Sequence, residues 1–92
     1  MGTVGVPVDL SLNTTVTTSA EGYVLIAGGS DAGTAVVVDF LDKNGTHMFY
    51  VFEVTPIVNA GSCTAIFVKK GTKLKCTRKD NGTNATFYPM TY

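Results

Sequence analysis

Apolar and β-branched residues recur along the chain in short runs that alternate with clusters of glycine, asparagine, aspartate and proline. The turn signals recur at roughly 8 to 12 residue intervals, and no run shows the apolar period of about 3.6 residues that marks a helix. The pattern therefore predicts short strands joined by turns, with no helix longer than a turn. The expected strands are Val8–Leu12, Thr14–Thr18, Tyr23–Ala27, Thr34–Leu41, His47–Val54, Cys63–Val68, Lys73–Thr77 and Ala85–Tyr88.

Turn residues indicate how some of these strands are connected. The Asn-Gly pair at 44–45 separates two β-rich runs and can adopt the positive φ angles of a tight hairpin. The runs on either side of it are therefore expected to pair in antiparallel fashion. Pro56 and Pro89 are expected to end strands, because proline cannot donate a hydrogen bond to a ladder. Further turns are expected at 69–71 and 81–82.

These elements predict an all-β fold, an antiparallel β-sandwich or jelly roll of seven to eight short strands. The chain has 92 residues, which is enough for one domain with a modest core. Residues 8–92 are expected to form this single β-sandwich domain, and the glycine-rich residues 1–7 a flexible leader. The order of the strands within the sheets is not evident from the pattern.

Three of the expected strands are apolar on both faces, although an antiparallel sheet in a two-layer protein normally leaves one face to water. In the segment 47–54, Tyr50 and Phe52 alternate with Phe49 and Val51. Loops of the same chain could cover the outer faces, but self-association is the favoured interpretation because few residues remain for covering. The residues expected at the interface between copies are Val24, Ile26, Val37, Phe49 and Val51.

Charge and hydropathy limit the partners that the chain can have. Seven basic and seven acidic residues cancel, so net charge does not support binding to nucleic acid or to a membrane surface. The charged residues are unevenly distributed, with a net charge of −5 over residues 1–60 and of +5 over residues 61–92. The basic residues alternate with Leu74 and Cys76 at strand spacing, which favours a solvated sheet face. No apolar run reaches the roughly 18 to 20 residues that cross a bilayer, so no membrane insertion is expected.

The two cysteines, Cys63 and Cys76, are too few for a disulfide framework and lack zinc-binding spacing. If the chain folds back at 69–72, they lie nearly opposite each other on paired strands, where a bridge is possible but usually strained. Free and mostly buried thiols are the favoured interpretation. The alternative of a bridged pair stays open at this point.

No arrangement of reactive residues indicates catalysis. His47 and either cysteine could form a nucleophilic pair, but a histidine that follows a hairpin turn has a simpler explanation as a strand residue. Asp31, Asp39 and Asp42 lack the spacing of a calcium-binding loop. The sequence therefore predicts a non-enzymatic protein with no metal and no cofactor.

Three segments carry a resemblance to a known family: Thr18–Val24, which contains Glu-Gly-Tyr; Ile66–Leu74, which contains Val-Lys-Lys-Gly; and Thr86–Met90, which contains Phe-Tyr-Pro. Together they resemble the recurring frame of C-terminal tip domains of bacteriophage fibres. The match covers about residues 18–92, and this chain departs from the usual frame in its two cysteines and in its Met-Thr-Tyr end. The resemblance implies a trimeric jelly roll similar to those of the complement C1q and tumour necrosis factor type.

The resemblance also implies a function, that of a receptor-binding tip in the virion that trimerises and attaches to a glycan or protein of the bacterial surface. Loops on a rigid sandwich can vary without disturbing the core, so contact with the ligand is expected from them. The candidate residues are Ser30, Asp31, Asn59, Asn81, Asn84 and Tyr92. The alternatives are a structural module for capsid decoration or fibre trimerisation, without a ligand site, and a secreted bacterial carbohydrate-binding module that works as a monomer.

Overall fold

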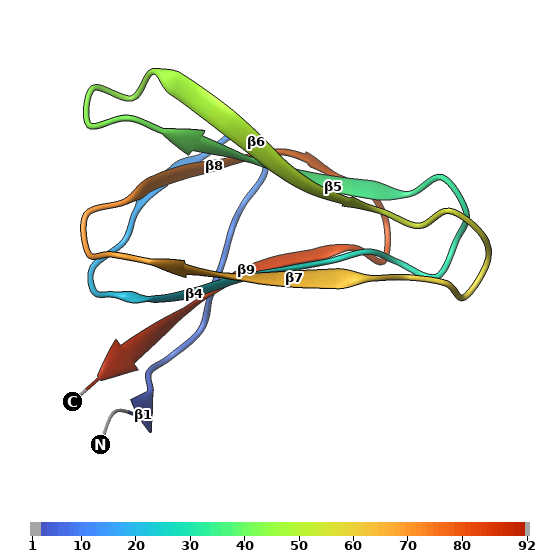
Figure 1. Ribbon diagram of the computed structural model, residues 1–92, viewed down its shortest axis with the longest axis horizontal. Helices are drawn as coiled ribbons and strands as arrows, with labels where there is room; N and C mark the ends of the chain where they lie inside the picture. The colour runs from blue at the N-terminus through green and yellow to red at the C-terminus, as the bar shows by residue number, and fades with distance from the viewer. Residues whose placement is uncertain (1–2, 92) are drawn as a thin grey trace.

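The computed structural model describes residues 3–91, which form nine strands and no helix (Figure 1). The strands are β1 (Thr3–Val4), β2 (Val8–Asp9), β3 (Thr15–Thr17), β4 (Gly22–Ala27), β5 (Ala35–Leu41), β6 (His47–Val54), β7 (Cys63–Val68), β8 (Lys73–Lys79) and β9 (Asn84–Thr91).

The strands form two sheets that face each other. Sheet I has the order β1-β9-β4-β7, with β2 also paired to β9, and sheet II has the order β3-β8-β5-β6. All pairs of these strands are antiparallel. The edge strands β6 and β7 lie on the same side of the sandwich, the side nearer the viewer in Figure 1. The antiparallel all-β sandwich expected from the sequence is confirmed.

The hairpin in the middle of the chain follows the sequence pattern closely. β6 and β7 have the bounds expected for them, and β5 begins one residue later than expected. β5 and β6 pair on either side of a turn in which Gly45 has a φ of 83°. This conformation is in the left-handed region, where glycine lacks the steric cost of a side chain. The expected antiparallel neighbours are therefore confirmed.

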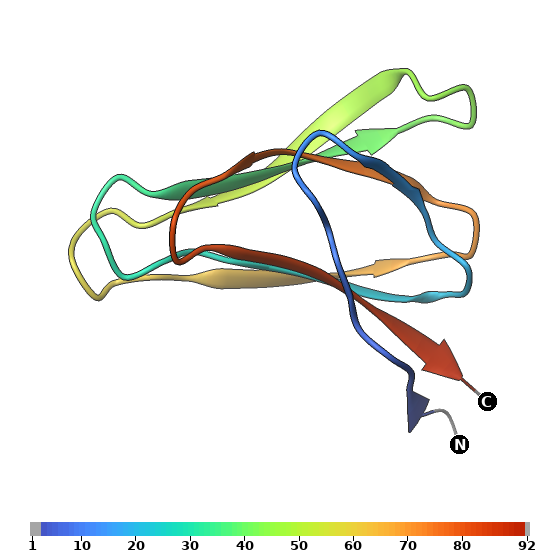
Figure 2. The same ribbon diagram turned by 180° about the vertical axis from the view of Figure 1, so that it is seen from behind.

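The first part of the chain is less regular than expected. Strands were expected over Val8–Leu12 and Thr14–Thr18, but only Val8–Asp9 and Thr15–Thr17 are strands. Between them the chain crosses from sheet I to sheet II, as Figure 2 shows from behind. Asn13 has a φ of 59°, which interrupts an extended strand.

The segment expected as a flexible leader, residues 1–7, contains a short strand. Thr3 pairs with Thr91 and Val4 pairs with Met90, so β1 extends sheet I beside the last strand. This pairing involves backbone groups far apart in the sequence, which the local pattern could not indicate. Met1 and Gly2 lie outside the described residues.

β9 does not end at Pro89, where the sequence predicted a stop, but continues to Thr91. The Met90 N–H donates to the Glu21 carbonyl oxygen at 2.9 Å. In an antiparallel ladder, hydrogen-bonded pairs alternate with pairs that exchange no hydrogen bond, so the adjacent pair of Gly22 and Pro89 needs no N–H from the proline. Proline is therefore tolerated inside this strand.

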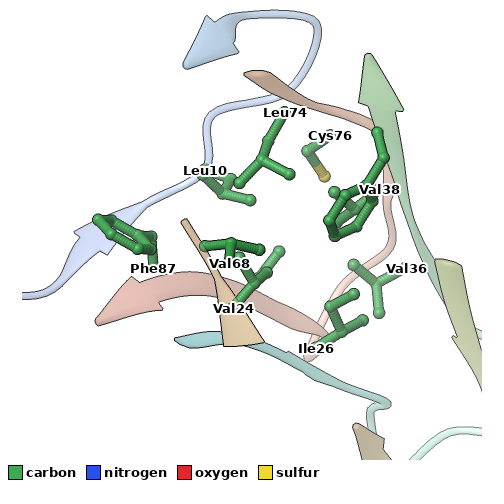
Figure 3. Close-up of a cluster of buried hydrophobic side chains, with 11 residues drawn as sticks. Leu10, Val24, Ile26, Val36, Val38, Val68, Leu74, Cys76 and Phe87 are labelled. Carbon is green, nitrogen blue, oxygen red and sulfur yellow. The ribbon is translucent and has the colours of Figure 1, made fainter. Parts of the chain in front are cut away.

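One core fills the space between the sheets (Figure 3). Its side chains come from alternate positions of β4, β5, β8 and β9, from Val68 at the end of β7, and from Leu10 in the crossover after β2. The burial of apolar side chains removes their surface from water, which is the main favourable term in folding. The core residues are Leu10, Val24, Ile26, Val36, Val38, Phe40, Val68, Leu74, Cys76, Ala85 and Phe87.

The turns expected at 69–71 and 81–82 exist, but each joins strands of different sheets. β7 and β8 therefore do not pair, and Cys63 and Cys76 do not lie opposite each other on neighbouring strands as considered above. Both thiols are free. Cys76 is buried as expected, whereas Cys63 is exposed at the start of an edge strand.

Candidate functional site

The polar loop residues singled out from the sequence come together at one end of the sandwich. The β4–β5, β6–β7 and β8–β9 loops meet there, at the right of Figure 1. The Asn59 N–H donates to the Ser30 carbonyl oxygen at 2.8 Å, and a Cβ on Gly29 would stand 3.2 Å from the Asn81 carbonyl oxygen. Five candidates are exposed in these loops or beside them: Ser30, Asp31, Asn59, Asn81 and Asn84. Tyr92 lies outside the described residues.

Polar contacts, one of them buried, hold these loops in place. The Thr55 side chain is fully buried, and its hydroxyl donates to the Gly29 carbonyl oxygen at 2.6 Å. The Ala35 N–H donates to the Asp80 carboxylate at 2.8 Å, and Arg78 also donates to this carboxylate. The Arg78 guanidinium and then the Ala35 N–H hold the pKa of Asp80 below its ordinary value. The loop end can therefore present hydrogen-bonding groups on a fixed frame.

The outer face of sheet I carries aromatic side chains in a row across three strands. Tyr23 of β4 pairs with Phe67 of β7 on one side and with Tyr88 of β9 on the other. Tyr23 and Phe67 are 45% and 49% exposed, and their rings meet edge to face at 5.5 Å. We call Tyr23, Leu25, Phe67 and Tyr88 the aromatic face. The sequence did not indicate this row, because it forms only when β4 lies between β7 and β9.

The edge strand β6 is the second exposed apolar element. Phe49 belongs to the side of β6 that turns towards sheet I, where its ring stacks on Phe40 at 4.9 Å and yet is 49% exposed. Val51 on the same side packs against the core. Because no strand of the described chain pairs with the other side of β6, its outer backbone groups face solvent. We use the name β6 edge for Phe49 together with the unpaired backbone groups of β6.

The structure corrects part of the expected interface between copies. Val24 and Ile26 are fully buried in the core, because the inward face of β4 carries them and its outward face carries Tyr23 and Leu25. Val37 does lie on an outer face, that of sheet II, where it is half-buried. The sequence showed two apolar faces for this strand but could not show which one turns inward.

His47 is anchored on the outer face of sheet II. Its Nδ1 contacts the carboxylate of Asp39, a residue on β5 whose side chain is only 9% exposed. The imidazole ring also lies against the ring of Tyr50, at a centroid distance of 4.3 Å. A register shift between Phe40 and Leu41 places His47 on the same face as Tyr50. The histidine is thus held in one orientation by a charge beneath it.

A row of cations runs along β8 on the same outer face. Lys73 and Lys75 alternate with the buried residues Leu74 and Cys76, and Arg78 pairs with the outward-facing Val37 after a register shift. The sequence pattern predicted a solvated sheet face here. The pattern did not show that β6, which lies beyond β5 in the same sheet, adds aromatic rings to this face.

Glu53 links the two edge strands. Its carboxylate accepts hydrogen bonds from the hydroxyls of Ser62 and Thr64, at the start of β7. These two hydroxyls hold the pKa of Glu53 below its ordinary value, against a smaller opposing effect of burial. The contact fixes the spacing of β6 and β7 near the loop end.

The reactive residues considered from the sequence are separated. Cys76 lies in the core, where burial raises the pKa of its thiol, whereas His47 lies on the outer face of sheet II. Within residues 3–91, no three histidine, cysteine or carboxylate side chains gather as a metal site requires. No helix in the described part of the chain is long and apolar enough to cross a membrane.

An open depression lies at the end opposite the loops, between the β3–β4 and β7–β8 connections. Charged side chains of both signs and one methionine are among the residues that line it. The lining residues are Ser19, Ala20, Glu21, Lys69, Lys70 and Met90. None of them was expected from the sequence to bind a ligand.

Comparison with known proteins assigns no family: no family model fits the sequence, and no curated protein or solved structure is significantly similar to it.

Proposed function

We propose that this chain is a non-enzymatic tip domain of a bacteriophage fibre, which assembles as a homotrimer and attaches to the bacterial surface. The observation that carries the proposal is the apolar surface that a single copy leaves exposed, the aromatic face on sheet I and the β6 edge. Contiguous apolar surface of this kind on a soluble chain usually marks an interface. In this proposal the chain is part of the virion.

The strand order supports a jelly roll. β1 and β2 can be counted as one interrupted strand, and the resulting eight strands can be renumbered 1 to 8 along the chain. Their spatial order is then 1-8-3-6 in sheet I and 2-7-4-5 in sheet II. Strands that are consecutive in the sequence thus lie in different sheets, except for the two strands of the β5–β6 hairpin. A jelly roll built from two Greek keys has this arrangement. This order agrees with the fold that the resemblance of Thr18–Val24, Ile66–Leu74 and Thr86–Met90 implies.

The difference between the two exposed surfaces supports a ring. A two-fold dimer uses the same patch on both copies, whereas a ring joins two different patches of each copy. The aromatic face is a sheet surface and the β6 edge is a strand edge, so the edge of one copy can pack on the face of the next. The number of copies, three, comes from the family resemblance.

The first test is the mass in solution. Native mass measurement should give about three times 9.7 kDa for the wild type. Phe67→Asp places a charge in the aromatic face and should weaken association at least tenfold. Val58→Asp is the matched control, because Val58 is 64% exposed in the β6–β7 loop, outside both surfaces. A wild-type chain that runs as a monomer at micromolar concentration would contradict the proposal.

The second test is attachment. The labelled wild-type protein should bind intact cells of some bacteria in a panel of diverse species and should leave other species unlabelled. A trimer that binds none of them would favour the structural alternative, a module for capsid decoration or fibre trimerisation. The monomeric carbohydrate-binding alternative is less well supported, because a single copy leaves the aromatic face and the β6 edge exposed to water.

A further inference from the structure

The outer face of sheet II combines two rows of side chains on either side of β5. The row on β8 contains the cations Lys73, Lys75 and Arg78. The row on β6 contains Tyr50 and Phe52, which are 54% and 61% exposed. Two strand spacings separate the rows, about 10 Å. Neither row belongs to the aromatic face or to the β6 edge.

The accessible charge of this face is positive. The carboxylate of Asp39 lies between the rows but is 9% exposed and in contact with His47. Arg78 forms a salt bridge with Asp80 at 2.7 Å. Lys73 donates to the hydroxyl of Thr17, a neutral partner. The ammonium groups of Lys73 and Lys75 are therefore available to an anion, although the whole chain has a formal net charge of zero.

His47 adds an oriented polar group beside the aromatic row. Because Nδ1 is held by the Asp39 carboxylate, the other ring nitrogen, Nε2, is left for a partner outside the protein. Burial of a carboxylate costs free energy unless the group is paired, and His47 is the partner of Asp39. Such an arrangement is typical of sites in which a buried group positions a contact residue.

We propose that the outer face of sheet II binds an acidic polysaccharide. Lys73 and Lys75 bind its acid groups, Tyr50 and Phe52 pack against sugar rings, and His47 Nε2 hydrogen-bonds a hydroxyl. The inference rests on the proposed function and deepens it, because it names the ligand class and places attachment on a sheet face rather than in the loops.

The chemistry of this face favours a polysaccharide over a nucleic acid. Single-stranded nucleic acids bind in positively charged grooves that follow the backbone over several nucleotides. This face offers two available lysines on a chain without net positive charge. An oriented histidine and two exposed rings suit a ligand rich in hydroxyl groups with only occasional acid groups.

Titration calorimetry with defined probes tests the inference. The probes are polygalacturonate oligomers as an acidic polysaccharide, dextran as a neutral one, inorganic polyphosphate as an anion without sugar, and oligo(dT). Polygalacturonate should bind at least about tenfold more tightly than the other three, and more weakly as salt is raised. Absence of polygalacturonate binding, or equal or tighter binding of polyphosphate or oligo(dT), would overturn the inference.

Matched variants locate the site. Lys73→Gln/Lys75→Gln should weaken polygalacturonate binding about tenfold, whereas Lys69→Gln/Lys70→Gln, which removes the same charge from the β7–β8 turn, should leave it unchanged. Tyr50→Ala should weaken binding at unchanged native mass. If both double lysine variants lost the same amount of affinity for polygalacturonate, binding would reflect general charge attraction, and the site would be refuted.

Binding to intact bacteria separates this inference from the proposed function. If wild type and Lys73→Gln/Lys75→Gln bind cells equally well, the site on sheet II is wrong and the attachment function stands. If the wild type binds polygalacturonate through this face but binds no bacteria, the attachment function fails and the site stands.

Discussion

Gly22 determines how closely β4 and β9 approach each other. A Cβ at this position would lie 2.1 Å from the Tyr88 carbonyl oxygen and 3.0 Å from the Phe87 ring, distances at which the backbone must shift. The φ angle of Gly22 is not positive, so close approach rather than turn conformation requires glycine here. The Glu-Gly-Tyr segment that carries part of the family resemblance thus has a packing role.

Gly22→Ala should therefore destabilise the protein strongly, by about 3 kcal/mol or more. Gly45→Ala is the control, because Gly45 has open space around it and a φ of 83°, and it should cost about 1 kcal/mol. Urea unfolding of both variants measures the difference. Equal destabilisation would show that β9 can move away from β4 at little cost.

The carboxylate of Glu53 should make stability depend on pH. Its pKa is lowered in the folded protein by the hydroxyls of Ser62 and Thr64. Its contribution is therefore complete above the ordinary value of 4.5 and is lost as the pH falls through the lowered folded value. Glu53→Gln should reduce the free energy of unfolding at pH 7 and much less at pH 3, as measured by urea unfolding. If Glu53→Gln lowered the free energy of unfolding by the same amount at both pH values, this role of the carboxylate would be contradicted.

At the level of elements, the sequence predicted the β5–β6 hairpin well because all its signals are local. The Asn-Gly turn and the two flanking runs lie within the segment 35–54, and the strands pair with each other directly. The partners of β4, which are β7 and β9, follow it by dozens of residues. No local pattern reports such pairing, so the aromatic face and the inward position of Val24 were not evident.

The free edge of β6 gives an element-level prediction. In the Phe67→Asp variant, at a concentration where it is monomeric, the β6 amides that face away from β5 should exchange with solvent fast, because no strand of the described chain covers them. In the assembled wild type the same amides should be protected at least about tenfold more if the β6 edge packs on the next copy. Amide hydrogen exchange by NMR measures this, with the β4 amides as the internal reference. Equal exchange in both proteins would remove the β6 edge from the interface.

For the whole molecule, the two sides of the sandwich differ. The crossover after β2 closes one side and inserts Leu10 between the sheets (Figures 2 and 3). The side between β6 and β7 is bridged by Glu53 near the loop end and is open towards Phe49. The sequence indicated an apolar residue at position 10 within an expected strand. It did not indicate that the chain leaves the sheet there, because Leu10 belongs to neither sheet and its N–H donates to the Ala85 carbonyl oxygen.

Leu10→Ala should therefore act on stability and leave assembly unchanged. Leu10 is fully buried, and its truncation should cost about 2 to 5 kcal/mol. The native mass should stay that of the wild type at temperatures where the variant is folded, unlike that of Phe67→Asp. Thermal unfolding and native mass together measure both effects. A loss of assembly in folded Leu10→Ala would mean that the closed side also contacts other copies.

The pairing of β1 with the end of β9 has a practical consequence. Thr3 and Thr91 lie side by side, at the end of the molecule away from the β4–β5, β6–β7 and β8–β9 loops (Figure 1). A tether joined to either terminus would leave these loops pointing outward. The same adjacency makes circular permutation feasible, since a short linker could join the old ends while new ones are opened at the Asn-Gly turn, and the domain could then serve as a scaffold for displaying grafted peptides.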